Sequence, residues 1–144
     1  MKTHSSSKAL VHFLEQEIPF NKFMGLRVEL AENGLARLFL PYRPEFTGDA
    51  RRPALHGGIL STLIDTCGGV AVWTLCKVDD RIATIDMRVD YLRPAPQADL
   101  IAEAKVRLMG NRVGNAQTRI FRREEPDKII AEGRAVYNIR RHES

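Results

Sequence analysis

Cysteine is scarce in this sequence, which has only Cys67 and Cys76 among its 144 residues. The two lie nine residues apart in an apolar stretch, and on a helix that spacing separates them by about 13 Å along the axis. This distance exceeds the span of a disulfide. A disulfide-stapled scaffold is therefore excluded, and we expect two reduced, buried thiols in a cytoplasmic protein.

Metal-ligand and serine-nucleophile patterns are also missing. His4, His12 and His142 are scattered without metal-ligand spacing, so we expect no bound metal. No Gly-x-Ser-x-Gly sequence occurs, which counts against a serine hydrolase. Arginines are spread over the predicted strands without an aromatic-rich basic motif, so nucleic acid is a poor candidate partner.

No segment is typical of export or of membrane insertion. The first twenty residues, MKTHSSSKALVHFLEQEIPF, lack the apolar core of a signal peptide and contain Glu15 and Glu17. The apolar stretch of residues 54–75 is nearly long enough to cross a bilayer. However, it contains His56, Asp65 and four glycines, which indicates a helix buried in protein. We expect no association with a membrane.

The composition is typical of one globular domain. Hydrophobic residues make up 44% and charged residues 28% of the chain, which is long enough to bury a core. We expect a single domain over residues 1–144, with a helical segment over residues 1–17. The net charge of +4 is mildly basic and suits polyanionic partners, among them phosphorylated small molecules.

The first third of the sequence predicts a short helix and a hairpin. Ser5–Ser7 are expected to cap a helix that continues through about Gln16 and that Pro19 ends. Two short strands then follow, joined at Asn33-Gly34, which is a strong hairpin signal.

A long apolar helix and four further strands complete the predicted fold. The helix is expected from about Gly58 to Leu75, apolar on most of its circumference. From Ile82 onward, apolar and polar residues alternate as in a half-buried strand. The sequence therefore predicts an α+β fold, with one curved antiparallel sheet of about six strands around the central helix. The residues expected on the apolar face of the first of these strands are Ile85, Met87, Val89 and Tyr91.

Two glycines lie where the long helix is expected to begin. The first N–H groups of a helix lack intrahelical partners, and the helix dipole adds partial positive charge there. Because Gly57 and Gly58 carry no side chain, a carbonyl oxygen or an oxyanion can approach that backbone closely. Tight packing between loop and helix accounts for the same glycines equally well, and both interpretations stay open.

A single carboxylate, Asp65, interrupts the apolar helix. An ionised side chain on a buried helix is costly unless it is paired or hydrogen-bonded. Its neighbours one turn away are Ser61 and Thr62 on one side and Gly68 and Gly69 on the other. Hydroxyls and open space suit an acid that meets a substrate. A structural aspartate satisfied by Thr62 or by backbone is the alternative.

Gly57 and Asp65 cannot reach one reacting atom within one chain. Eight residues separate them, which corresponds to about 12 Å on a straight helix and exceeds the length of a thioester group. Two antiparallel helices from two chains can bring them together. If both residues are catalytic, the enzyme is at least a dimer with its active sites at the interface.

Three segments of the chain together resemble the hotdog-fold acyl-CoA thioesterases of the PaaI-like group. These segments are, in order, IPFNKFMGLRV, LHGGILSTLIDTCGG and TIDMRVDYLRPAP. The resemblance runs from about Ile18 to Ile139. It implies a hotdog fold, in which a curved antiparallel sheet wraps a helix, and homodimers that often pair into tetramers.

The resemblance also implies roles for individual residues. The Gly57 N–H would polarise the thioester carbonyl, and Asp65 of the opposite subunit would act as nucleophile or as general base for water. His56 would orient the loop or the carbonyl. Thr84 would assist the attacking water, with a plain strand residue as an equal alternative. The residues expected to bind the rest of the substrate are Gly58 and, near the CoA phosphates, Arg93, Asn111 and Arg112.

The loop before His56 departs from the family pattern. Ala50 replaces an asparagine that commonly helps to bind the thioester carbonyl, and Pro53 replaces a usual glycine. Compensation by a neighbouring charged residue is expected, from Asp49, Arg51 or Arg52. The acyl preference depends on residues whose relative placement the sequence does not give, such as Leu60, Ile64, Trp73 and Met87.

The combined expectation is a cytoplasmic acyl-CoA thioesterase that hydrolyses an acyl-CoA to a free acid and CoA. It needs no cofactor, because CoA is part of the substrate. One alternative is a hotdog hydratase or dehydratase that acts on 3-hydroxyacyl or enoyl thioesters through His56 and Asp65. The other is a non-catalytic protein that binds acyl-CoA.

Overall fold

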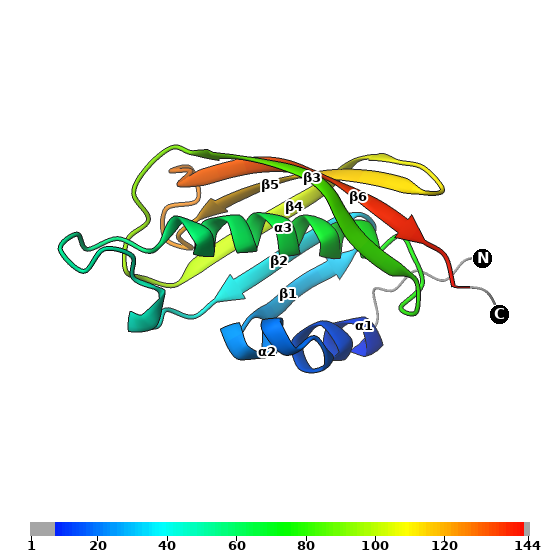
Figure 1. The fold of residues 1–144 in the computed structure, drawn as a ribbon, viewed down its shortest axis with the longest axis horizontal. Coiled ribbons are helices and arrows are strands. Elements are labelled where there is room, and N and C mark those ends of the chain that lie inside the picture. The colour runs from blue at the N-terminus through cyan, green and yellow to red at the C-terminus, as the bar shows by residue number, and fades with distance from the viewer. Residues whose placement is uncertain (1–7, 143–144) are drawn as a thin grey trace.

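Within residues 8–142, which the computed structural model describes, a six-stranded antiparallel sheet curls around one long helix. The helix is α3 (Gly57–Trp73), and the sheet order is β1-β2-β4-β5-β6-β3. Figure 1 shows α3 lying lengthwise within the curve of the sheet, with β3, β5 and β6 above it and β1 and β2 below it. The expected hotdog arrangement of one curved sheet around a central helix is confirmed. The strands are β1 (Arg27–Glu32), β2 (Leu35–Leu40), β3 (Arg81–Tyr91), β4 (Leu100–Met109), β5 (Val113–Phe121) and β6 (Ala131–Arg140).

α3 is buried because apolar side chains cover most of its circumference. Leu63, Ile64 and Cys67 are fully enclosed, and the helix contacts every strand of the sheet. Burying one such Leu or Ile side chain stabilises the fold by about 2 kcal/mol. The helix begins at Gly57 and ends at Trp73, close to the expected bounds.

The predicted hairpin forms between β1 and β2. Asn33 and Gly34 both have positive φ, 52° and 78°, as a two-residue type I′ turn requires. The Gly34 N–H donates a 2.7 Å hydrogen bond to Oγ1 of Thr74, a buried residue just after α3. The turn thereby holds the carboxyl end of the helix.

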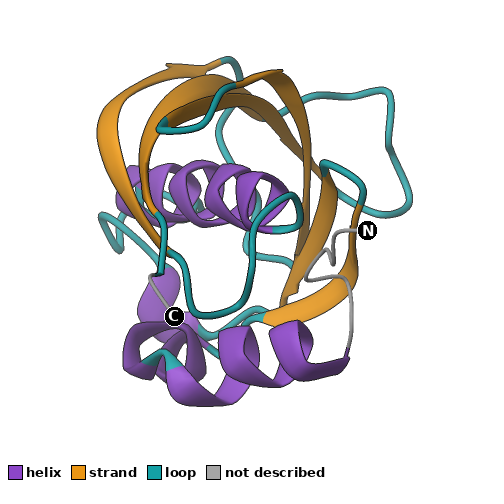
Figure 2. Ribbon diagram, turned by 90° about the vertical axis from the view of Figure 1, so that its right-hand side faces the viewer, coloured by secondary structure: helices purple, strands orange, loops and turns teal. Residues whose placement is uncertain are grey.

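The N-terminal segment consists of α1 (Lys8–His12), a π-helical turn (Phe13–Glu17) and α2 (Pro19–Met24). The expected cap at Ser5–Ser7 lies outside the described residues. Pro19 does separate two helical pieces, but it also begins α2, because its fixed φ suits a first helical position. Figure 2 shows these helices across the open side of the curved sheet.

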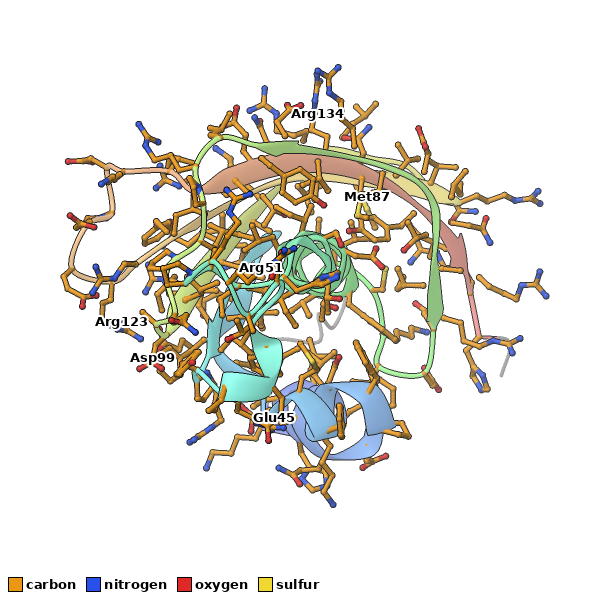
Figure 3. The ribbon with its side chains drawn as sticks, turned by 60° about the vertical axis from the view of Figure 1, so that its left-hand side comes forward. Glu45, Arg51, Met87, Asp99, Arg123 and Arg134 are labelled. Atoms are coloured by element: carbon orange, nitrogen blue, oxygen red, sulfur yellow. The ribbon has the colours of Figure 1, made fainter. Side chains whose placement is uncertain are left out.

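β3 is an edge strand, and its face pattern differs from the predicted alternation. A bulge between Thr84 and Asp86 leaves Ile85 unpaired with β6 and 58% exposed, because a bulge turns its extra residue away from the ladder. Tyr91, at the end of the strand, is 55% exposed. Met87 and Val89 pack against the core as expected. Figure 3 shows Met87 on the inner side of the sheet and Arg134 on its outer side.

Candidate active site

His56 fixes the loop at the start of α3. Its Nδ1 accepts a 2.8 Å hydrogen bond from the Gly58 N–H, and its carbonyl oxygen accepts one of 2.9 Å from the Ile59 N–H. Within residues 8–142, the Gly57 N–H has no hydrogen-bond partner. Of the two glycines, Gly57 is therefore the one whose amide is available to a ligand, whereas the Gly58 amide is occupied.

A cleft of about 430 Å³ opens beside this loop. Tyr91 packs against Gly57, since a Cβ added to Gly57 would lie 3.4 Å from Cε1 of the ring. The Arg93 side chain lines the same cleft and donates a hydrogen bond to the carbonyl oxygen of Ile129. The cleft therefore joins one unbonded backbone amide to a basic side chain. Its other lining residues include Gly48, Asp49, Arg52, His56 and Leu60.

The loop before His56 turns at Asp49. The Arg52 N–H donates to the Asp49 carbonyl oxygen at 2.9 Å, and the Arg51 side chain forms an ion pair of 2.7 Å with the Asp49 carboxylate. The hydrogen bonds from Arg51 lower the pKa of Asp49. Asp49 and Arg52 line the cleft, whereas the Arg51 side chain is 88% exposed. Of the three residues expected to compensate for Ala50, Asp49 and Arg52 therefore lie at the cleft, and their compensating role stays a prediction.

Asp65 lies half-buried in the middle of α3, facing β3. Its Oδ1 accepts a 2.6 Å hydrogen bond from Oγ1 of Thr84. Its Oδ2 has no hydrogen-bond partner among the residues that the structure describes. The hydroxyl that binds the carboxylate is that of Thr84 and not that of Thr62, which was the expected partner of a structural aspartate. One oxygen is held in place and the other is open, which suits a base or a nucleophile.

Tyr137 on β6 is a neighbour of Asp65 that the sequence did not reveal. Its hydroxyl donates a 2.7 Å hydrogen bond to the Asp65 carbonyl oxygen, and its ring packs against Gly69. Burial, and then the nearby Asp65 carboxylate, raise the pKa of Tyr137 well above 10.0, so the phenol stays protonated. A side chain at Gly68 would collide with this hydroxyl. The glycine pair one turn after Asp65 was the available signal, since it indicates a large neighbour.

A second, narrower cleft of about 170 Å³ reaches Asp65 and Thr84. It runs between α3 and the N-terminal segment. Trp73 is also part of its lining, and its indole Nε1 is buried without a hydrogen-bond partner in the described part of the chain. The predicted catalytic residues therefore fall into two separate clefts of one chain, Gly57 in the first and Asp65 in the second.

The residues expected near the CoA phosphates also lie in two separate places within one chain. Arg93 follows the carboxyl end of β3. Asn111 and Arg112 form the turn between β4 and β5, where the Arg112 carbonyl oxygen accepts a hydrogen bond from Ile139. Ile139 pairs with Ile82 near the start of β3, so the two groups lie toward opposite ends of that strand.

Both cysteine side chains are buried, and neither forms a disulfide. Burial raises the pKa of Cys76 to about 11 and also raises the pKa of Cys67, so both thiols stay protonated. Within residues 8–142, no three His, Cys, Asp or Glu side chains form a cluster that could hold a metal. No helix in the same range has both the length and the apolar character needed to cross a membrane.

Comparison with known proteins identifies the family. A model of the thioesterase superfamily matches residues 53–129. A putative esterase of Halobacterium salinarum is 46% identical over 98 residues, which are 66% of this chain and 64% of the relative. The medium/long-chain acyl-CoA thioesterase YigI of Salmonella typhimurium is 30% identical over 85% of this chain and 86% of its own.

A solved structure of a thioesterase-superfamily protein superposes with a TM-score of 0.83 at 34% identity. It covers 92% of this chain and 97% of that one. The matched segment includes the His56–Gly58 loop and Asp65, so it spans both halves of the candidate site. The chain therefore belongs to the thioesterase superfamily, shares its hotdog fold and is a thioester hydrolase.

Proposed function

We propose that the protein hydrolyses acyl-CoA thioesters to a free acid and CoA, with the Asp65 carboxylate as the catalytic base or nucleophile. The observation that carries this proposal is the Asp65 carboxylate, with Oδ1 held by Thr84 and Oδ2 open at a cleft. The similarity to a relative named as an acyl-CoA thioesterase supports CoA as the thiol part of the substrate. CoA leaves as a product, so the proposal requires no separate cofactor.

The complete site requires two copies of the chain. β3 lies at the sheet edge, and along it Tyr91 contacts Gly57 while Thr84 binds Asp65. In the proposed dimer, β3 pairs antiparallel with β3 of a second copy, and the two-fold axis passes between Thr84 and Tyr91. This pairing brings the Gly57 cleft of one protomer next to the Asp65 cleft of the other. The 58% exposed Ile85 supports this edge as the interface, since the unpaired backbone groups of an edge strand invite pairing and an exposed apolar side chain favours burial.

The same strand pairing would bring the residues expected to bind the CoA phosphates close together. Arg93 lies at the Gly57 end of β3, and Asn111 with Arg112 lies near the Asp65 end. Antiparallel pairing therefore collects Arg93 of one protomer and the Asn111–Arg112 turn of the other around one site. This assigns the CoA phosphates to a surface built from both subunits. A homodimer is the smallest active form, and the buried protonated thiols fit the reducing cytoplasm.

The geometry suggests a sequence of steps. The thioester carbonyl oxygen accepts a hydrogen bond from the Gly57 N–H, which strengthens as negative charge develops on that oxygen. Asp65 either takes a proton from water as the water oxygen attacks the carbonyl carbon, or attacks that carbon itself to give an anhydride that water then hydrolyses. In both routes the C–S bond breaks, CoA departs as the thiol and one water is consumed.

The direct test is thiol release by Asp65→Asn. We expect the rate to fall by at least about a hundredfold, because a base or nucleophile is lost, while the dimer persists in size-exclusion chromatography. Near-normal turnover in the folded variant would refute the role of Asp65. Crotonyl-CoA is included as a substrate: hydration without thiol release would establish the hydratase alternative, and acyl-CoA binding without any turnover by wild type would establish the binding protein.

Subunit mixing tests the shared site. Gly57→Pro removes the N–H at a first helical position, and the preceding His56 has an extended backbone with ψ of 136° that tolerates a following proline. Gly57→Ala keeps the N–H and is the matched control. Mixing Gly57→Pro with Asp65→Asn protomers restores about a quarter of wild-type activity if each site uses both chains. If each site lies within one chain, no activity returns.

A further inference from the structure

The narrow cleft at Asp65 continues along α3 as an apolar channel. Asp65, Gly69 and Trp73 follow one another at intervals of four residues, so they lie on one face of the helix. Eight residues of helix span about 12 Å. The channel therefore starts at the proposed reacting group and extends for about two helical turns along α3.

The opposite wall comes from the N-terminal segment. Leu14 of the π-helical turn, the connecting residue Ile18 and Asn21 of α2 all line the channel. Glu15, next to Leu14, accepts a 2.7 Å hydrogen bond from the Val28 N–H, so the segment is tied to β1. The wall is thus fixed to the sheet.

The channel is open in its middle and closed at its end. Gly69 has no side chain to occupy the space between Asp65 and Trp73. At the far end, the Trp73 ring meets the Phe13 ring edge-on, with 5.4 Å between their centroids. Phe13 comes from the π-helical turn, a feature that is frequent at functional sites.

Two polar side chains of the channel wall, Asn21 and Tyr137, are occupied by hydrogen bonds within the protein. The Asn21 Nδ2 donates to the Leu14 carbonyl oxygen at 3.1 Å, and the Tyr137 hydroxyl donates to the Asp65 carbonyl oxygen. The indole Nε1 of Trp73 is a buried donor without a hydrogen-bond partner in the described part of the chain. The volume of about 170 Å³ is spread along about two turns of α3, so the space is long and thin. A slender apolar chain fits such a space along its length, whereas an aromatic ring is wider than the chain.

We propose that this channel holds the acyl group of the substrate, that its chemistry selects an unbranched aliphatic chain over an aromatic acyl group, and that Trp73 sets the longest chain accepted. The proposal rests on the proposed acyl-CoA thioesterase function and adds the acyl class and its determinants. Trp73 is the residue that ends the channel, and Gly69 is the residue that keeps it open.

Two variants with opposite effects test the channel. Trp73→Phe shortens the ring at the closed end while keeping an aromatic contact for Phe13. We expect the ratio of kcat/KM for long over short saturated acyl-CoAs to rise about tenfold, the effect of one or two methylenes in an apolar pocket. Gly69→Ala adds a methyl group whose carbon lies 3.4 Å from the Tyr137 ring, an ordinary contact. We expect that ratio to fall about tenfold.

The control and substrates make the outcomes decisive. Phe23→Ala alters a 68% exposed side chain of α2 outside the channel, and its profile should match wild type. Thiol release is measured from saturated acyl-CoAs of increasing length and from benzoyl-CoA and phenylacetyl-CoA. Wild type should prefer an aliphatic chain. A preference for the aromatic substrates overturns the proposed acyl class.

The proposed function and the channel fail in different ways. If wild type releases thiol from none of these substrates, the proposed function is wrong and the channel assignment falls with it. If wild type is active but Trp73→Phe leaves the chain-length profile unchanged, the function stands and the channel assignment is overturned. Should Gly69→Ala fail to fold by circular dichroism, Trp73→Phe alone decides.

Discussion

The Tyr137 hydroxyl donates a 2.7 Å hydrogen bond to the backbone carbonyl oxygen of Asp65. Tyr137 also pairs with Thr84 in the β3–β6 ladder, and Thr84 binds the Asp65 carboxylate. Tyr137 therefore fixes the helical turn that carries the carboxylate, and Thr84, its cross-strand neighbour, fixes the carboxylate itself. Tyr137 acts as a positioning residue for Asp65.

Tyr137→Phe is expected to impair turnover more than stability. Loss of one neutral hydrogen bond costs about 1 kcal/mol in the free energy of unfolding, measured by urea denaturation. The loosened turn displaces Asp65, and kcat should fall about tenfold with a smaller change in KM. Unchanged kcat in the folded variant would show that Thr84 alone suffices to place the carboxylate.

Gly68→Ala is expected to destabilise the protein through the same contact. A Cβ at residue 68 would lie too close to the Tyr137 hydroxyl for both to keep their places. Overpacking of this kind costs about 2 kcal/mol. In the double variant with Tyr137→Phe the cost should be smaller than the sum of the two single costs, because the colliding oxygen is gone. Additive costs in urea denaturation would contradict the contact.

Thr84→Ala is expected to lower kcat/KM about tenfold, less than Asp65→Asn does. The alanine removes the hydroxyl that holds Oδ1 of Asp65 at 2.6 Å, but it leaves the carboxylate in place. Thr84→Ser keeps the hydroxyl and is the matched control, with near wild-type thiol release. Equal losses in Ala and Ser variants would mean that the methyl group, not the hydrogen bond, matters.

His56→Ala is expected to weaken the start of α3. The variant removes the Nδ1 acceptor of the Gly58 N–H, and loss of a helix cap costs about 1 kcal/mol in the free energy of unfolding. Asn is a good cap residue, so His56→Asn should recover most of that stability. Identical unfolding midpoints for wild type and His56→Ala would refute the capping role.

Asp80 is expected to confer stability that acid removes. Burial alone would raise its pKa, but hydrogen bonds from the His142 and Lys77 N–H groups and the Arg141 guanidinium outweigh burial and hold the pKa below 3.8. The folded state therefore favours the ionised form, so this stability is present above pH 3.8 and is lost as the pH falls through the lowered pKa.

Asp80→Asn is the variant that measures this contribution. At pH 7 it should lose about 2 kcal/mol in the free energy of unfolding, because hydrogen bonds to a charged acceptor are replaced by neutral ones. The difference from wild type should shrink as the pH falls below 3.8. A difference that stays constant from neutral to acidic pH would assign the effect to packing.

The sequence predicted those elements that depend only on residues close together in the chain. Asn33 and Gly34 favour positive φ in a tight hairpin, and the run around Leu63 is apolar on most of its circumference, so the turn and the helix were predictable. The contact of Tyr137 with Asp65 joins residues 72 positions apart, and the local glycine pair indicates a large neighbour without identifying it. The alternation at Ile85 was wrong because the bulge depends on how β3 pairs with β6.

The sheet order carries a consequence for biosynthesis. β6, the last strand, lies between β5 and β3, so β3 has no neighbour in the sheet until the ribosome has made residue 131 and those that follow. A nascent chain arrested before that point leaves the inner edges of β3 and β5 bare and Asp65 without Tyr137. Folding of the sheet therefore waits for β6, and a chain that lacks this strand exposes edges that favour aggregation.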